Sequence, residues 1–286
     1  MKLEGFRYAT SLDLTMGYYH ITLCPVSWKL CTIVLPWGKF EYQKLPMGLC
    51  NSPDIFQEKM NELFHDLEYV RAYIDDLLII SNSSFQDHLN KVKIVLNKLK
   101  AAGFKINAEK SFFARDSLEY LGFLITREGI MPLPEKVQAI KDIAVPNHKR
   151  QVRSFIGIIN YYRDMWKRRS DTLTPLTQMT SKQANWKWTE EHQKAFEHMK
   201  KSISRETLLV YPDFNKPFEI HTDASKVQLG AVISQDNKPI AFYSRKLNPA
   251  QVNYTTTERE LLSIVETLKD VRNILLGQQI RNILLG

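Results

Sequence analysis

The chain has 286 residues, of which 44% are hydrophobic and 24% are charged, and this ordinary globular composition excludes a disordered protein. Its length allows two or three domains with sizeable cores. The formal net charge is +8, and the excess lies in the middle of the chain. Residues 1–126 carry 14 basic and 14 acidic side chains, whereas residues 127–215 carry 16 and 10. Such a basic segment is typical of proteins that bind a polyanion, although a solvated basic face explains it equally well.

Targeting and cysteine patterns favour a location inside the cell. The N-terminal residues Met1 to Gly5 contain no apolar region of a signal peptide, and no apolar run approaches the ~20 residues that span a bilayer. The three cysteines (Cys24, Cys31 and Cys50) form no CxxC pair, and their odd number provides no disulfide framework. We therefore expect a cytoplasmic protein with no membrane partner.

The first half of the chain mixes predicted strands and helices. Residues 6–50 alternate short apolar stretches with turns, which predicts strands and loops. Ser52 followed by Pro53 predicts a helix start, with the Ser52 side chain as the cap. Two strands, 70–73 and 77–81, are predicted to form a hairpin, and an amphipathic helix then runs to Gly103. This mixture without βαβ regularity predicts an α+β fold.

The second half changes from helices to strands. The pattern is helical from Pro132 to about Arg205, and three strand-like runs follow at 218–223, 229–235 and 239–245. A helix is predicted from about Thr257 to Lys269, so these elements begin a second α/β unit. The hexapeptide Arg-Asn-Ile-Leu-Leu-Gly occurs at 272–277 and again at 281–286. Two copies nine residues apart do not make a repeat fold.

Asp75 and Asp76 are adjacent carboxylates within an apolar run. Burying them without partners would be very costly, so they either lie in an exposed hairpin turn or bind a cation. For the pair alone, the turn is the commoner explanation. Asp13 is a further carboxylate in a strand-like setting, and three aspartates would offer hard oxygen ligands to Mg²⁺. Two such ions about 4 Å apart could activate a primer 3′-hydroxyl and stabilise pyrophosphate. Spacing alone does not place Asp13 beside Asp75.

Five segments resemble, in order, the palm motifs of reverse transcriptases, as found in the pol polyprotein of gypsy-type long-terminal-repeat retrotransposons. A lone YxDD is weak evidence, but five motifs in the right order are very specific, and the resemblance covers nearly the whole chain. The segments are Ser11 to Ile21, Leu45 to Pro53, Tyr73 to Asp76, Gly103 to Ser111, and Glu119 to Phe123, the last of which resembles the primer grip.

The resemblance implies an RNA-directed DNA polymerase of a transposable element, in which Asp13, Asp75 and Asp76 hold two Mg²⁺ ions at a nucleotidyl-transfer site. Tyr18 would crowd the sugar 2′ position, and Lys110 would donate a proton to pyrophosphate. A core tyrosine and a solvated lysine remain open as simpler roles for these two residues. The other implied substrate contacts are Met47, Gly48, Leu121 and Gly122.

The resemblance also implies three domains. Residues 1–126 would be a palm with its fingers largely missing, residues 127–215 a helical, basic thumb and connection, and residues 216–286 a truncated RNase H-like α/β unit. The implied partners are an RNA template, a DNA primer, deoxynucleoside triphosphates and other pol segments such as an integrase, with virus-like particles as the location. Basic side chains of the middle domain are expected to grip phosphates: Lys149, Arg150, Arg153, Arg163, Lys167, Arg168 and Arg169.

Departures from the family pattern limit the expected activity. Asp223 and Glu260 resemble two RNase H carboxylates, with Glu258 as the alternative to Glu260; from the residues alone, a turn residue and a helix first-turn acid explain them better. We expect the chain to end before the strand that brings the third carboxylate, and we expect no RNase H activity. Only twelve residues precede Asp13, so the fingers contacts to the triphosphate are expected to be missing. Two functions therefore stay open: an active polymerase, and a catalytically incomplete remnant that binds nucleic acid without polymerising.

Overall fold

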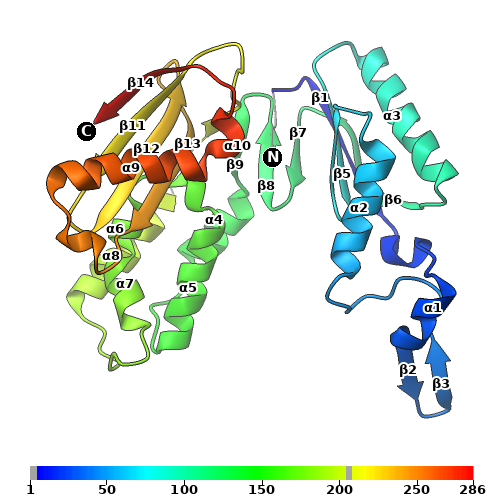
Figure 1. The fold of residues 1–286 in the computed structure, drawn as a ribbon, viewed down its shortest axis with the longest axis horizontal. Coiled ribbons are helices and arrows are strands. Elements are labelled where there is room, and N and C mark those ends of the chain that lie inside the picture. Colours follow the sequence, from blue (N-terminus) through cyan, green and yellow to red (C-terminus); the bar gives the residue numbers. More distant parts are fainter. Residues whose placement is uncertain (1–4, 204–207, 286) are drawn as a thin grey trace. The chain divides into compact units, whose positions relative to one another are not determined.

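The computed structural model describes residues 5–203 and 208–285, and these form two compact units (Figure 1). The first unit contains residues 6–121 and 125–127, and the second contains residues 122–124 and those described from 128 onward. The further division predicted at residue 215 stays a prediction. Two predicted features, the helix end at Arg205 and the final Gly286 of the duplicated hexapeptide, lie outside the described residues. Within the described ranges, no helix is long and apolar enough to cross a membrane.

The first unit is built on a four-stranded sheet in the order β4-β5-β1-β6. Its strands are β1 (Tyr8–Leu14), β4 (Val70–Tyr73), β5 (Asp76–Ser81) and β6 (Ile106–Arg115). Helices α2 (Ser52–Phe64) and α3 (Phe85–Ala101) pack against it, and residues of both join the sheet in one apolar core that includes Leu12, Phe56, Leu77, Ile79 and Val95. Alternate residues of the strands and one face of each helix contribute the apolar side chains of this core.

One predicted cap in this unit is wrong. Ser52 is the first residue of α2 and makes no capping hydrogen bond; Asn51 stands in the cap position without a side-chain bond. The buried Ser52 hydroxyl instead donates a 2.7 Å hydrogen bond to the carbonyl of Pro46. The Pro53 signal for a helix start was sound, because proline sits in the first turn. Ser52 therefore ties the preceding loop to the helix.

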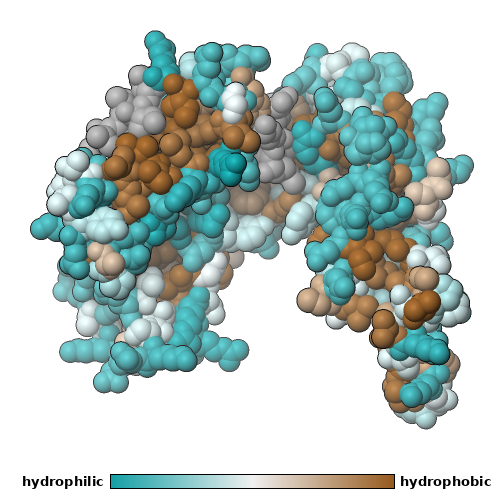
Figure 2. Space-filling model, in the orientation of Figure 1, coloured by the Kyte–Doolittle hydropathy of each residue, from teal (hydrophilic) through white to brown (hydrophobic). Residues whose placement is uncertain are grey.

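The segment between β1 and α2 is open to solvent. It contains α1 (Pro25–Trp28) and the two-stranded hairpin β2 (Thr32–Leu35) with β3 (Gly38–Glu41). Apolar surface gathers on this segment in Figure 2. Its exposed apolar side chains include Val26, Leu30, Val34 and Trp37. A short strand, β7 (Ser117–Tyr120), ends the main part of the first unit.

The second unit begins with strands and then helices. The strands β9 (Gly129–Pro132) and β10 (Leu209–Val210) are paired, and β8 (Phe123–Thr126) begins in this unit and ends in the first. The helices are α4 (Pro134–Lys141), α5 (Lys149–Tyr161), α6 (Arg169–Thr172), α7 (Thr174–Met179) and α8 (Glu190–Ile203). Their apolar faces meet in a core around Val152, Phe155 and Phe196, with the Phe155 and Phe196 rings 4.7 Å apart. The predicted helical middle of the chain is confirmed.

A second four-stranded sheet follows, in the order β13-β12-β11-β14. The three predicted strands are β11 (Phe218–Ala224), β12 (Gln228–Gln235) and β13 (Lys238–Lys246), and they form an antiparallel meander. Helix α9 (Thr256–Asp270) and the short α10 (Arg272–Leu275) pack on this sheet through a core that includes Phe218, Ile233 and Val271. Antiparallel sheets with separate helices confirm the predicted α+β class.

The prediction that the chain ends before a fourth strand is wrong. The second copy of the duplicated hexapeptide contributes to β14 (Ile280–Leu285), which pairs in parallel with β11. The first copy instead contributes to α10, so identical residues form a helix in one place and a strand in the other. Sheet pairing overrides local propensity there. No Asp or Glu occurs in residues 280–285.

Candidate active site

The Tyr73 to Asp76 motif forms a tight hairpin between β4 and β5. Tyr73 and Asp76 are paired across the ladder, so the turn consists of Ile74 and Asp75 rather than of the two aspartates. Ile74 has a φ of 52°, a left-handed conformation that is rare for a β-branched residue. Such strain persists only where surrounding structure holds it, and it clusters at functional sites.

Gln57 of α2 holds this strained turn. Its Oε1 accepts a 2.8 Å hydrogen bond from the Ile74 N–H, and its Nε2 donates to the Ala72 carbonyl at 3.1 Å. The same amide donates to Asn61 at 2.9 Å, one helical turn further along. Gln57 therefore fixes the turn to the helix and, with it, the position of Asp75. The sequence interpretation missed this residue; its one signal was a polar side chain next to the apolar face of α2.

The structure places the backbones of the three predicted aspartates next to one another. Asp13, near the end of β1, is the register partner of Asp76, the first residue of β5. The N–H of Leu14 donates to the Asp75 carbonyl at 3.2 Å, which places the turn beside the end of β1. An antiparallel pairing of β1 with β5 was not readable from spacing, since the two strands are more than 60 residues apart.

The three carboxylates repel one another. Burial raises the pKa of the Asp75 carboxyl, and the negative charges of Asp13 and Asp76 raise it further. Burial also raises the pKa of Asp76, with the charge of Asp13 as the second cause. The Oδ1 atom of Asp75 is buried and has no hydrogen-bond partner. A cation bound between these groups would remove both the repulsion and the unpaired buried oxygen.

The three carboxylates are suitable ligands for a hard cation, but they do not form a complete metal-binding group by themselves. Across the described residues, no group of three or more His, Cys, Asp or Glu side chains stands close enough to hold a metal ion. Carboxylate oxygens are the ligands that Mg²⁺ prefers, and Mg²⁺ ordinarily keeps several waters and uses one or two protein carboxylates. The unpartnered Asp75 oxygen and the raised pKa values therefore fit a cation that is completed by water and substrate.

Tyr18 lies beside these carboxylates. It belongs to a 3₁₀ turn (Gly17–His20) and stacks on Phe56 with ring centroids 4.9 Å apart. Burial raises the pKa of the Tyr18 hydroxyl, and the charge of Asp75 adds to the effect. A Cβ atom on Gly17 would lie 2.5 Å from Asp75 Oδ1 and 2.7 Å from the Phe56 ring, so only glycine fits at this position without a shift. Tyr18 therefore both packs against Phe56 and lies close to Asp75.

The other predicted contacts of the first unit are exposed. Met47 is 56% exposed, and Gly48 follows it with a φ of 96° that favours glycine. The Ser52 hydroxyl holds this loop through Pro46. Lys110 lies on β6 with an exposed side chain, and its role as a proton donor stays a prediction.

Leu121 and Gly122 lie at the end of the first unit and the start of the second. Both have left-handed φ angles, 47° and 70°. The Gly122 carbonyl accepts a 3.0 Å hydrogen bond from the Tyr162 hydroxyl, and a Cβ atom on Gly122 would lie 2.5 Å from the Tyr161 hydroxyl. Glycine is therefore required where α5 packs on this turn, and the primer-grip role of the pair stays a prediction.

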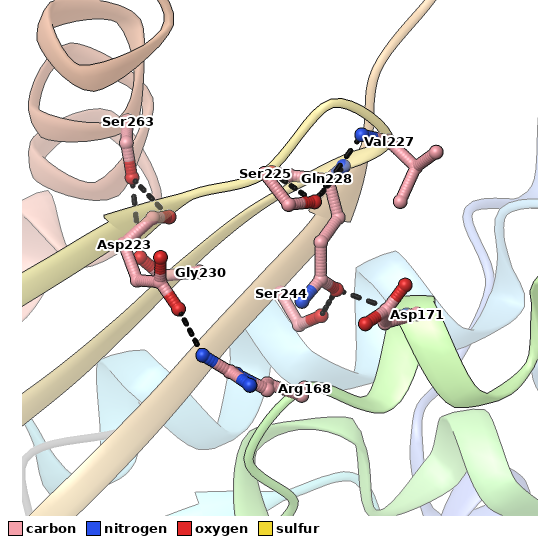
Figure 3. A network of polar contacts seen from close by, with 9 residues as sticks. All are labelled: Arg168, Asp171, Asp223, Ser225, Val227, Gln228, Gly230, Ser244 and Ser263. Atoms are coloured by element: carbon pink, nitrogen blue, oxygen red, sulfur yellow. Dashed lines mark hydrogen bonds and ion pairs between the residues drawn. The ribbon is translucent and has the colours of Figure 1, made fainter. Parts of the chain in front are cut away.

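Asp223 and Glu260 have different surroundings. The Asp223 carboxylate accepts a 2.7 Å hydrogen bond from Arg168 in an ion pair, as Figure 3 shows. Its backbone carbonyl accepts from Ser263 of α9, at 3.3 Å. Glu260 is half-buried on the same helix, one turn before Ser263. In the described part of the chain, no third acid joins them in a metal-binding group.

The alternative ligand, Glu258, has a structural role. Its carboxylate accepts hydrogen bonds from the Thr255 N–H at 2.7 Å and from the Thr255 hydroxyl at 2.8 Å, and the Thr255 hydroxyl accepts from the Glu258 N–H. This reciprocal pair is a capping box at the start of α9. These hydrogen bonds lower the pKa of the Glu258 carboxyl. The preference for Glu260 over Glu258 as a ligand candidate is consistent with this cap.

Most basic residues predicted to grip phosphates have partners within the unit. Lys149 donates to the Ser181 carbonyl at 2.8 Å, and Arg153 donates to the Thr180 carbonyl at 2.8 Å. Arg163 pairs with Asp164, Arg168 with Asp223, and Arg169 bonds Asn160 and Ser244. Arg150 and Lys167 have exposed side chains. Among the aromatic residues that lie between these basic residues in the sequence, Tyr162 and Trp166 are buried in the core, whereas Tyr161 is 54% exposed.

Two family models match the chain. Residues 1–125 match the reverse transcriptase (RNA-dependent DNA polymerase) family, and residues 188–282 match the RNase H-like domain found in reverse transcriptase. The second match begins within the segment predicted as thumb and connection. Together they confirm the predicted order of a palm followed by an RNase H-like domain.

Retrotransposon proteins are similar over nearly the whole chain. The retrovirus-related Pol polyprotein from transposon 297 of Drosophila melanogaster is 37% identical over 97% of this chain, and that from transposon gypsy of the same organism is 35% identical over 97%. The Tf2-3 polyprotein of Schizosaccharomyces pombe is 34% identical over 96%. The chain spans only 26%, 28% and 21% of the lengths of these relatives.

Solved structures confirm the fold. The foamy viral protease–reverse transcriptase in complex with an RNA/DNA hybrid matches with a TM-score of 0.87 at 24% identity, covering 98% of this chain and 38% of that one. The same protein in complex with double-stranded DNA matches with a TM-score of 0.85, covering 98% and 59%.

Proposed function

Because this chain belongs to the reverse transcriptases of long-terminal-repeat retrotransposons, we propose that its first unit is the palm of an RNA-directed DNA polymerase. It would extend the 3′-hydroxyl of a DNA primer along an RNA template with deoxynucleoside triphosphates. The observation that carries this proposal is the meeting of Asp13, Asp75 and Asp76 at the ends of β1 and β5, with one Asp75 oxygen buried and unpartnered.

Reverse transcriptases are metal-dependent polymerases, and we propose Mg²⁺ as the ion, with two ions held by Asp13, Asp75 and Asp76. Bound at these carboxylates, the ions would supply a Lewis acid for the primer hydroxyl and the leaving pyrophosphate. The support from this chain is electrostatic: burial and mutual repulsion raise the pKa values of Asp75 and Asp76, so a positive charge is favourable there.

The chain's own residues would position the substrates. Gln57 holds the Ile74–Asp75 turn, so the Asp75 carboxylate keeps one position during the reaction. Tyr18, stacked on Phe56 beside Asp75, would lie against the sugar of the incoming nucleotide and exclude a 2′-hydroxyl. The exposed Met47–Gly48 loop would face the nucleotide and template, and Lys110 would give a proton to pyrophosphate.

A primer-extension assay on poly(rA)/oligo(dT) tests the proposal. The purified chain should extend the primer in Mg²⁺, and the isosteric Asp75→Asn variant should not, because it removes a charged ligand without changing shape. A variant that binds the template–primer as the parent does would show that folding is intact. Salt-sensitive binding without extension by the parent itself would instead support the catalytically incomplete remnant.

We also propose that the RNase H-like domain does not cleave RNA. A two-ion nuclease needs several carboxylates at one place, and here Asp223 is paired with Arg168 while β14 brings no acid to the neighbouring position. The assay is degradation of the RNA strand of an RNA–DNA hybrid. Cleavage by the parent that disappears in Asp223→Asn would overturn this proposal and leave the polymerase proposal untouched.

A further inference from the structure

The short segment from Arg168 to Asp171 lies against the sheet formed by β11, β12 and β13 (Figure 3). Arg168 has a φ of 52°, a left-handed conformation that is unfavourable for a residue other than glycine. This backbone starts α6 and directs the guanidinium to β11, where Nη2 lies 2.7 Å from Asp223 Oδ2. A strained residue at this point indicates that its contacts with the sheet hold it there.

The residues after Arg168 bond to the other two strands. Arg169 donates to the Ser244 carbonyl on β13 at 3.1 Å, and the Ser170 N–H donates to the Ser244 hydroxyl at 2.9 Å. The Asp171 N–H donates to Gln228 Oε1 on β12 at 2.9 Å. Consecutive residues of one segment thus reach all three strands.

The two acceptors on the sheet are buried and joined. Gln228 is 4% exposed and Ser244 is 8% exposed, and the Ser244 hydroxyl donates to Gln228 Oε1 at 3.1 Å. Buried polar groups that lose a partner are left unsatisfied, which costs more than the loss of an exposed hydrogen bond. The network therefore favours one docked position of the segment.

The charge at Asp223 is already balanced by the protein. A metal ligand needs its carboxylate oxygens for the ion, but Arg168 holds Oδ2 at hydrogen-bond distance. Strand β14 pairs in parallel with β11, with Leu285 opposite Thr222, and its sequence contains no acid. Glu258, on α9, is bonded to Thr255 in the capping box. The surroundings of Asp223 thus contrast with those of Asp75.

We infer that Asp223 anchors the Arg168–Asp171 segment and is not a metal ligand, and that the Arg168 ion pair fastens the helices α4–α8 to the RNase H-like sheet. In this arrangement the guanidinium supplies the positive charge that a divalent cation would otherwise supply. Arg168 and Arg169 are then structural residues rather than phosphate contacts. The inference concerns the second unit alone and does not depend on the polymerase proposal.

Thermal unfolding of the whole chain tests the anchor. Arg168→Gln and Asp223→Asn should each lower the unfolding midpoint by about 2–4 °C, the shift expected for an exposed ion pair of about 1 kcal/mol in a unit of this size. Because both changes break the same ion pair, the double variant should be no less stable than either single variant. Full additivity of the two shifts would overturn the inference.

A second ion pair of the same unit is a matched control. Lys216 and Asp236 also lie 2.7 Å apart with exposed side chains, but Lys216 lies two residues before β11 and Asp236 in the turn between β12 and β13, so this pair joins neighbouring parts of the sheet and not a helical segment. Lys216→Gln should shift the midpoint by less than 1 °C, at the low end of exposed ion pairs. A shift as large as that of Arg168→Gln would mean that the Arg168–Asp223 pair stabilises the unit no more than an ordinary surface ion pair does.

Titration with Mn²⁺ alone separates the anchor from a metal ligand. The Asp223→Asn variant should bind the same number of Mn²⁺ ions as the parent chain, with the same affinity. Loss of a class of Mn²⁺ sites in Asp223→Asn would overturn the inference. Asp75→Asn in the same titration reports separately on the palm, so a failure of the polymerase proposal is visible without affecting the result for Asp223.

Discussion

Asp75 and Asp223 are both aspartates near strand ends of sheets, yet their surroundings differ. Asp75 faces two other carboxylates and keeps a buried oxygen without a partner, whereas Asp223 has a guanidinium 2.7 Å away. The first has only negative charges beside it, and the second has a positive charge supplied by the protein. The nearest charge, rather than residue type or secondary structure, therefore decides what a carboxylate can do.

The largest difference is expected in polymerisation. Asp76→Asn should lower primer extension about 10³-fold, because metal-based charge stabilisation is worth several kcal/mol. Asp223→Asn should change it less than about twofold, in keeping with a surface ion pair. Single-turnover extension rates of the two variants, each with template–primer binding measured, provide the check. Equal losses in both would remove the distinction between the two aspartates.

Gln57 should matter for turnover more than for nucleotide binding. Gln57→Ala removes the amide that holds Ile74 and Ala72, and a small displacement of Asp75 is expected to lower kcat about 10- to 100-fold. The KM for the nucleotide should change less. Gln86→Ala is the matched control, since Gln86 makes a similar bond to Asn90 on α3. A proportional rise in KM with unchanged kcat would contradict a positioning role.

Two glycines should respond in opposite directions. Gly17→Ala should destabilise the first unit by about 1–3 kcal/mol, because the new Cβ would overlap the buried Phe56 ring and Asp75. Gly157→Ala should stabilise the second unit by about 0.5–1 kcal/mol, since its Cβ meets nothing in the middle of α5. Urea unfolding measures both. A stabilising Gly17→Ala would show that the carboxylate centre is more loosely packed than the contacts indicate.

The smallest effect is on the pH dependence of stability. Because the folded-state pKa values of Asp75 and Asp76 are raised, these carboxyls stabilise the fold while protonated, and that contribution is lost as pH rises above 3.8 through the folded pKa. Asp75→Asn should therefore stabilise the chain increasingly as pH rises above 3.8 in EDTA, until the folded pKa is passed. Asp223→Asn is expected to destabilise at neutral pH. Melting curves across this range would contradict the electrostatic account if Asp75→Asn showed a constant shift.

Local patterns in the sequence determined the elements and the order of the motifs. Period-two apolar patterns predicted β11, β12 and β13 within a few residues of their observed bounds, and the helical pattern predicted the end of α3, because each pattern depends on neighbours a few positions apart. Pro53 and Gly103 marked a helix start and a helix end for the same reason. The five motifs in their order carry the resemblance to reverse transcriptases, because each motif is a short continuous segment.

Tertiary structure alone decided which charges meet. The register that puts Asp13 opposite Asp76, the reach of Gln57 to Ile74, and the pairing of Arg168 with Asp223 join residues 17 to 63 positions apart. The hexapeptide that forms α10 in one copy and part of β14 in the other is the clearest case, since its sequence is the same in both. The difference between the helix and strand propensities of this hexapeptide is smaller than the free energy gained by pairing at a sheet edge. Long-range packing therefore determines which structure each copy forms.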